Sequence, residues 1–143
     1  MSEGATLATD RLLLREFQYA LTLKSDGRLI GSGGVRVCDP ESRQADIGYE
    51  LDPRFWGRGL ATEAARELLR FGFDVLGMHR LFGECVADNA ASARVMEKIG
   101  MRREAHLWEE AWFKDRWWDS LIYAVLEDEW RTARLDRAAP PGL

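Results

Sequence analysis

Two glycines set between arginines are the residues of this sequence best suited to chemistry. Residues 54–61 read Arg-Phe-Trp-Gly-Arg-Gly-Leu-Ala and join a strand-like segment to an amphipathic helix. The start of a helix leaves about four backbone N–H groups without partners inside the helix. Glycines let the backbone approach a ligand closely, and N–H groups at the positive end of a helix suit a phosphate. Gly57 and Gly59, flanked by Arg54 and Arg58, therefore predict an anion site.

Two glycines alone do not identify the ligand. Residues 54–61 lack the Gly-Lys-Ser or Gly-Lys-Thr of a P-loop. They also lack the GxGxxG of a dinucleotide site. A pair of glycines is equally common in a plain connection between a strand and a helix. A second motif is needed to interpret the first.

Asn89 and Ser92 belong to that second motif, in residues 88–101. Asn89 is more often a helix N-cap than a ligand contact. Ser92 lies on the stripe of its helix that the i, i+3, i+4, i+7 pattern predicts to be buried. A hydroxyl in that place either bonds back to the preceding turn or donates to a sulfur leaving group near the positive helix end.

Together these segments resemble the GNAT superfamily of N-acetyltransferases. Arg54, Gly57 and Gly59 match the family signature Arg/Gln-x-x-Gly-x-Gly/Ala. Residues 89–101 resemble the segment that follows the fifth strand of the family, and residues 117–123 resemble its RimJ/RimL-like branch. The resemblance covers about residues 28–130 and implies an acetyl-coenzyme A-dependent N-acetyltransferase. The alternative is a non-catalytic module that binds coenzyme A.

The resemblance also implies which residues hold the donor. In the family the glycine-rich loop binds the pyrophosphate of acetyl-coenzyme A, and the strand before it stabilises the oxyanion through its main chain. Carried over by position, the cofactor-binding residues are Leu51, Arg54, Trp56, Gly57, Arg58, Gly59, Leu60, Ala61, Asn89 and Ser92. Acetyl-coenzyme A is then the co-substrate, and no metal is implied.

Direct attack of an amine on a thioester needs a proton acceptor and a donor to the departing sulfur. Ser92 is the candidate donor. Glu50, on the strand that ends at the loop, is the first candidate base, although a solvated acid explains it equally well. Glu84 and Glu110 are further candidates. The RimJ/RimL-like branch assigns a base to a glutamate on its sixth strand, at a register that falls near Ala111 here.

The other segments predict a single α+β (mixed α/β) domain over residues 1–143, with a mostly antiparallel sheet flanked by helices. We expect an ordered core at 9–135, a flexible tail at 136–143 and a β-bulge within 31–34. The predicted strands are residues 11–17, 19–24, 29–37, 45–51, 81–87, 101–113 and 117–126, and the predicted helices are 60–75, 90–99 and 127–135.

Composition is that of a globular enzyme or binding module, with 46% hydrophobic and 31% charged residues and a net charge of −4. It gives no indication of nucleic acid or of a membrane. Cys38 and Cys85 are far apart in strand-like segments, which predicts buried, reduced thiols in the cytoplasm. The expected acceptor is an amine, on a protein N-terminus or a small molecule. Four tryptophans within residues 108–118 are expected in the core or at a homodimer contact.

The junction between the first two strands departs from the family. Residues 17–19 contain no Gly, Pro, Asn or Asp to form a turn. Members of the family normally carry about fifty residues there, with two helices beside the acceptor pocket. Either one long strand runs through the junction, or a helical pair between two strands is missing from this sequence.

Overall fold

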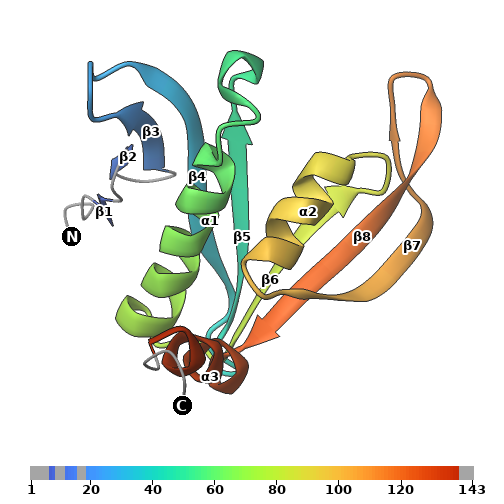
Figure 1. Cartoon of the computed structure of the whole chain (residues 1–143). Coiled ribbons are helices and arrows are strands. Elements are labelled where there is room, and N and C mark those ends of the chain that lie inside the picture. The colour runs from blue at the N-terminus through green and yellow to red at the C-terminus, as the bar shows by residue number, and fades with distance from the viewer. Residues whose placement is uncertain (1–6, 9–11, 16–18, 139–143) are drawn as a thin grey trace.

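The computed structural model describes residues 7–8, 12–15 and 19–138 and shows one twisted sheet with three α-helices (Figure 1). The eight strands described lie in the order β1-β2-β3-β4-β5-β6-β8-β7. Only β5 and β6 pair in parallel; the other neighbouring pairs are antiparallel. The mostly antiparallel α+β architecture is thus confirmed. The strands are β1 Leu7–Ala8, β2 Leu12–Arg15, β3 Tyr19–Leu23, β4 Leu29–Asp39, β5 Gln44–Leu51, β6 Arg80–Val86, β7 Arg102–Phe113 and β8 Arg116–Leu126.

The α-helices are α1 Leu60–Arg70, α2 Ala90–Lys98 and α3 Glu127–Ala138. Helices α1 and α2 lie side by side in front of the sheet in Figure 1, and α3 closes its lower end. A short 3-10 turn, η1 (Pro53–Phe55), precedes α1. Helix α3 is longer than the sequence predicts, because residues 136–138 extend it into the segment expected to be a tail.

The helical periodicity of residues 60–75 places Leu68 and Val75 on one apolar face, which is correct at Leu68 and wrong at Val75. Leu68 is fully buried, whereas Val75 is 58% exposed and Phe73 takes its place in the core. The reason is a π-helical turn, η2 (Phe71–Val75), that continues α1. A π turn holds more residues than an α turn, so it rotates the following side chains away from the 3.6-residue pattern.

The glycines of β4 allow close packing against β5. The β-bulge that was expected within residues 31–34 lies at residue 30, one residue before them. Leu21 pairs with Gly31 and Thr22 pairs with Leu29, so Ile30 is the extra residue. Residues 31–37 then pair with β5 in unbroken register. A Cβ on Gly31 would lie only 2.1 Å from the carbonyl oxygen of Glu50. The glycine is therefore needed for the approach of the two strands.

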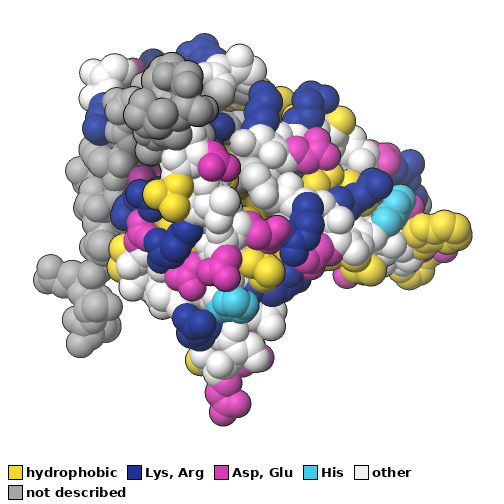
Figure 2. All heavy atoms as spheres, turned by 60° about the horizontal axis from the view of Figure 1, so that its bottom comes forward, with side chains coloured by type: hydrophobic (Ala, Val, Ile, Leu, Met, Phe, Trp, Pro, Cys, Tyr) yellow, Lys and Arg dark blue, Asp and Glu magenta, His cyan; other side chains and the backbone are white. Residues whose placement is uncertain are grey.

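The tryptophans of the β7–β8 hairpin are mostly exposed, so the core alternative is wrong for them and the homodimer contact stays a prediction. Trp108 is 81% exposed, and Trp112 and Trp117 are more than half exposed. Figure 2 shows hydrophobic side chains at the surface on the side where β7 and β8 lie. The hairpin is the edge of the sheet, so no further strand of the described chain covers it. Trp130 of α3 is buried instead, 5.0 Å from the ring of Phe73 between centroids.

The first two predicted strands form an antiparallel pair, because Leu12 pairs with Leu23 and Arg15 with Ala20. The alternative of one strand running through the junction is therefore wrong. Residues 17 and 18 of that junction lie outside the described residues. Cys38 is exposed rather than buried because β4 extends there beyond the core, while Cys85 is buried as expected. In the described part of the chain, no helix is long and apolar enough to cross a membrane.

Candidate functional site

The two parallel strands β5 and β6 separate soon after they meet. Their register contains three pairs, from Gln44 with Arg80 to Asp46 with Phe82. Beyond these pairs, β5 continues to Leu51 and β6 continues beside β8, so the carboxyl ends of the two strands are not paired with each other; the region between these ends is called the opening. In open sheets, ligands commonly bind outside the carboxyl ends of parallel strands. The glycine loop follows one of these ends, and the Asn89 segment follows the other.

The glycine loop has the conformation that a backbone anion site requires. Gly57 and Gly59 have φ angles of 76° and 75°, in the left-handed region that favours glycine. Gly59 is the N-cap of α1 and, having no side chain, forms no side-chain cap to the first N–H groups of the helix. These N–H groups are consequently available to a phosphate at the positive helix end.

The side chains of Arg54, Trp56 and Arg58 around this loop are exposed, and each has a contact within the protein. Arg54 forms an ion pair with Asp52 at 2.8 Å, so its charge is partly compensated within the protein. Arg58 lies 5.2 Å from the centre of the Phe55 ring. The Trp56 indole donates to the carbonyl oxygen of Leu51 at 2.7 Å and leaves the ring largely exposed.

Two of the predicted cofactor-binding residues in α1 face inward. Leu60 is buried in the core, and Ala61 is half-buried beside it. Their side chains are thus packed within the protein, and only their backbone groups belong to the exposed helix start. Of the two flanking arginines, Arg58 has no ion pair among the described residues, which leaves it the better placed cation for a phosphate.

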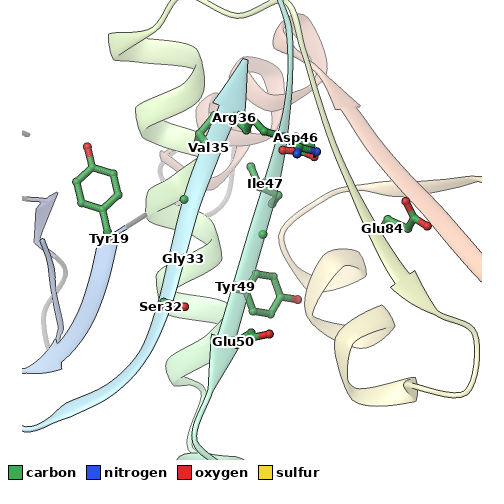
Figure 3. A pocket seen from close by; sticks show the side chains of 12 residues that line it. Tyr19, Ser32, Gly33, Val35, Arg36, Asp46, Ile47, Tyr49, Glu50 and Glu84 are labelled. Atoms are coloured by element: carbon green, nitrogen blue, oxygen red, sulfur yellow. The ribbon is translucent and has the colours of Figure 1, made fainter. Parts of the chain in front are cut away.

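Helix α2 forms the other wall of the opening. Asn89 caps it, with its side-chain oxygen accepting a bond from the N–H of Ser92 at 3.0 Å. The Ser92 hydroxyl is 3.3 Å from the hydroxyl of Tyr49 on β5. This contact is neither of the two alternatives that the sequence left open. It connects the two walls, and Figure 3 shows the Tyr49 ring directed from β5 toward α2.

Tyr49 is the residue of this site that the sequence analysis missed. Burial raises the pKa of its phenol, so the hydroxyl stays protonated at neutral pH. The sequence placed Tyr49 in the strand 45–51, next to Glu50, and the alternation of that strand put the two side chains on opposite faces. Because a tyrosine in a strand is usually explained by packing, no signal separated Tyr49 from the core.

A cavity of about 500 Å³ runs along β4 and β5, with α1 behind these strands in Figure 3. Its carboxylates are Asp46, Glu50 and Glu84, and its one lining arginine is Arg36. Arg36 pairs with Asp46 at 2.6 Å. Among the residues that the structure describes, Glu50 and Glu84 have no cationic partner, so the cavity wall carries excess negative charge.

Glu84, which lines this cavity, has a second carboxylate, Glu110, beside it. The buried Ser120 hydroxyl donates to Glu110 at 2.8 Å. Partial burial, followed by the negative charge of Glu110, raises the pKa of Glu84. A base with a raised pKa accepts a proton from an amine more readily. Glu50, the first candidate from the sequence, lines the same cavity and is exposed.

No metal cluster was found in the described ranges, where no three His, Cys, Asp or Glu side chains are grouped suitably. The chemistry available at this site comes from a helix start that can hold an anion, two bonded hydroxyls and nearby carboxylates. That combination suits acyl transfer between a phosphate-bearing donor and an amine.

Comparison with known proteins supports this interpretation. The model of the acetyltransferase (GNAT) domain matches residues 3–102. The chain is 41% identical over 85 residues to the uncharacterized N-acetyltransferase YnaD of Bacillus subtilis, covering 59% of this chain and 50% of that protein. It is 21% identical over 121 residues to the spermidine N(1)-acetyltransferase of Escherichia coli, covering 85% and 65%.

A solved GNAT-family acetyltransferase from Bacillus anthracis has a similar fold, with a TM-score of 0.79 and 25% identity. The match covers 87% of this chain and 99% of that one. The chain spans 50% to 64% of the length of the first curated relatives that it matches. Because the family model covers more than half of the sequence and the fold agrees, the chain belongs to the GNAT family of acetyltransferases.

Proposed function

We propose that this protein transfers an acetyl group from acetyl-coenzyme A to a primary amine, by direct attack of the amine on the thioester. The observation that carries the proposal is the opening between β5 and β6, with the glycine loop on one wall and Ser92 on the other. The backbone N–H groups of residues 57–61 would hold the pyrophosphate. Family membership supports acetyl transfer in general.

The proposed residues divide by role along this opening. Gly57, Gly59 and Arg58 would hold the phosphates of the donor. Residues Leu51, Arg54, Trp56, Leu60, Ala61 and Asn89 would form or support the walls around it. Ser92 would donate a hydrogen bond to the sulfur as it leaves, helped by the positive end of α2.

The acidic cavity supports a cationic acceptor. Glu50 and Glu84 line it without cationic partners in the described chain, whereas Arg36 is paired with Asp46. Opposite charges attract strongly where water is partly excluded. An amine that carries a further positive charge is therefore favoured over a neutral one. The name of the E. coli relative, a spermidine N(1)-acetyltransferase, agrees with this choice of acceptor.

We further propose Glu84, with Glu110 beside it, as the base that takes the proton of the attacking amine. The raised pKa of Glu84 supports this assignment over Glu50. The amine nitrogen forms its bond to the acetyl carbon while the carbon–sulfur bond breaks, and the electron pair of that bond leaves on sulfur. Glu50 remains the alternative base, on the same cavity wall.

The test is release of free coenzyme A. The protein is incubated with acetyl-coenzyme A and three acceptors: spermidine, a peptide with an unblocked N-terminus, and glycine benzylamide, which has no charge besides that of its amine. We expect thiol release above hydrolysis, fastest with spermidine. Release with none of them, although coenzyme A binds in calorimetry, would support the alternative of a non-catalytic coenzyme A-binding module. Preference for glycine benzylamide over spermidine would contradict the proposal that the acceptor carries a further positive charge.

Three broader assignments belong to the proposal. Residues 117–123 support the RimJ/RimL-like branch. The exposed tryptophans Trp108, Trp112 and Trp117 support a homodimer, which analytical ultracentrifugation tests. A cytoplasmic location is proposed as well, and fractionation of cells that express the protein tests it.

A further inference from the structure

We propose that Tyr49 is a positioning residue for acetyl transfer: its hydroxyl holds Ser92 so that the Ser92 hydroxyl hydrogen is free to bond to the departing sulfur. This inference rests on the proposed function and assigns a role to a residue outside the sequence motifs. Tyr49 would not touch the acetyl group itself. It would act through Ser92.

The first support is the pair of contacts between these residues. The Tyr49 hydroxyl lies 3.3 Å from the Ser92 hydroxyl and 3.5 Å from the Ser92 main-chain oxygen. A carbonyl oxygen can only accept a hydrogen bond, and a serine hydroxyl can both donate and accept. When the tyrosine hydrogen is directed at the serine hydroxyl oxygen, the serine hydrogen must point away from Tyr49. The serine can then donate into the opening.

The second support is that Tyr49 is firmly seated. On β4, Gly33 lies opposite Tyr49 in the register. A Cβ on Gly33 would stand 3.3 Å from the Cβ of Tyr49 and 3.4 Å from Leu68 of α1. The space on this side is therefore filled, and the half-buried ring is directed across the opening toward α2 (Figure 3). A side chain held in this way loses little freedom when it orders Ser92.

The third support is that Ser92 is fixed from a second direction. Its N–H donates to the Asn89 side chain at 3.0 Å, at the first turn of α2. Cys85 of β6 also interacts with Ser92: burial raises the pKa of this thiol, and the Ser92 side chain opposes that rise. A thiol is a weak hydrogen-bond acceptor, so it competes poorly with the electron-rich sulfur that leaves the thioester.

In the transfer step the amine nitrogen bonds to the acetyl carbon, and the electron pair of the carbon–sulfur bond moves to sulfur. The amine proton goes to the carboxylate base. The coenzyme leaves as a thiolate that accepts a hydrogen bond from Ser92. Because this bond strengthens as charge develops on sulfur, its loss lowers kcat rather than the affinity for the donor.

The experiment is a double-mutant cycle with Y49F, S92A and the double variant, using spermidine and an unblocked peptide as acceptors. Tyr123 provides the matched control, because it is a buried tyrosine of β8 whose hydroxyl bonds elsewhere, to Glu97 at 3.0 Å. We expect Y49F to lower kcat about tenfold with KM for acetyl-coenzyme A changed less than about twofold. S92A should lose at least as much, and the double variant no more than S92A. Y123F should keep kcat.

Three outcomes would overturn the inference alone: kcat of Y49F equal to that of the unaltered protein, an equal loss in Y123F, or losses in Y49F and S92A that multiply. If the protein turns over and Y49F has an unchanged kcat, the inference fails while the proposed function stands. If coenzyme A binds without turnover for any acceptor, the proposed function fails and the inference fails with it.

Discussion

Replacement of Gly31 by alanine tests how tightly the strands before the glycine loop are packed. The new Cβ would lie 2.1 Å from the carbonyl oxygen of Glu50 and 3.0 Å from the Cα of Leu51. The first contact is more than 1 Å closer than the 3.4 Å at which ordinary contact begins. Both atoms belong to the backbone, so no side chain can rotate away. Strands β4 and β5 must separate at this point.

The cost combines overpacking, about 1–3 kcal/mol, with the weakening of one or two hydrogen bonds of the register, each about 1 kcal/mol. We therefore expect G31A to lower the free energy of unfolding by about 3 kcal/mol. Asp52 follows Leu51, the last residue of β5, and donates its N–H to the carbonyl oxygen of Ile30 at 2.7 Å. The glycine loop that begins after Asp52 should therefore shift as well. Affinity for coenzyme A should fall together with stability.

Urea unfolding followed by tryptophan fluorescence measures this change. Gly48 of β5 is the control, because a Cβ there has no neighbour within 4 Å and its φ is not in the left-handed region. G48A should be neutral or stabilising by up to about 1 kcal/mol. If G31A and G48A unfold at the same urea concentration with the same m-value, the strands are not packed as described.

Three further predictions concern the loop, α2 and the carboxylates. N89A removes the cap of α2 and should cost about 1 kcal/mol in urea unfolding; no change would show that another group caps the helix. Hydrogen bonds from Arg54 lower the pKa of Asp52 to about 2, below the value of about 3.9 in an unfolded chain. Their stabilisation is thus complete above pH 4 and is lost as the pH falls toward 2, and D52N should remove this part of the acid dependence of stability. E110Q removes a charge that raises the pKa of Glu84, so the acidic limb of kcat/KM should move to lower pH; an unmoved limb excludes Glu84 as the base.

Much of the fold was predictable because local patterns agree with the packing. The Asn89 cap is a local feature and is as expected, and Gly100 after α2 has the left-handed φ angle that favours glycine at a helix end. The order and type of the predicted elements are likewise confirmed, since alternation and helical periodicity report burial directly. The glycine loop was recognisable for a similar reason: the backbone angles at Gly57 and Gly59 favour that residue type.

The remaining features depend on contacts that no local pattern contains. The register of β7 shifts between Leu107 and Ala111, and this irregularity brings Glu110 to Ser120, although a regular count points near Ala111. The Tyr49–Ser92 contact joins residues 43 positions apart, across an opening that exists only because β5 and β6 separate. The π turn after α1 similarly follows from packing against the sheet.

Amide hydrogen exchange with and without coenzyme A tests where the ligand binds, because it reports both binding and the residues that binding protects. The claim is that the ligand lies between the glycine loop and the start of α2. We expect slower exchange at the amides of residues 57–61 and around Ser92, and little change in the β7–β8 hairpin. Unchanged exchange at residues 57–61, with protection elsewhere or none at all, would contradict the account.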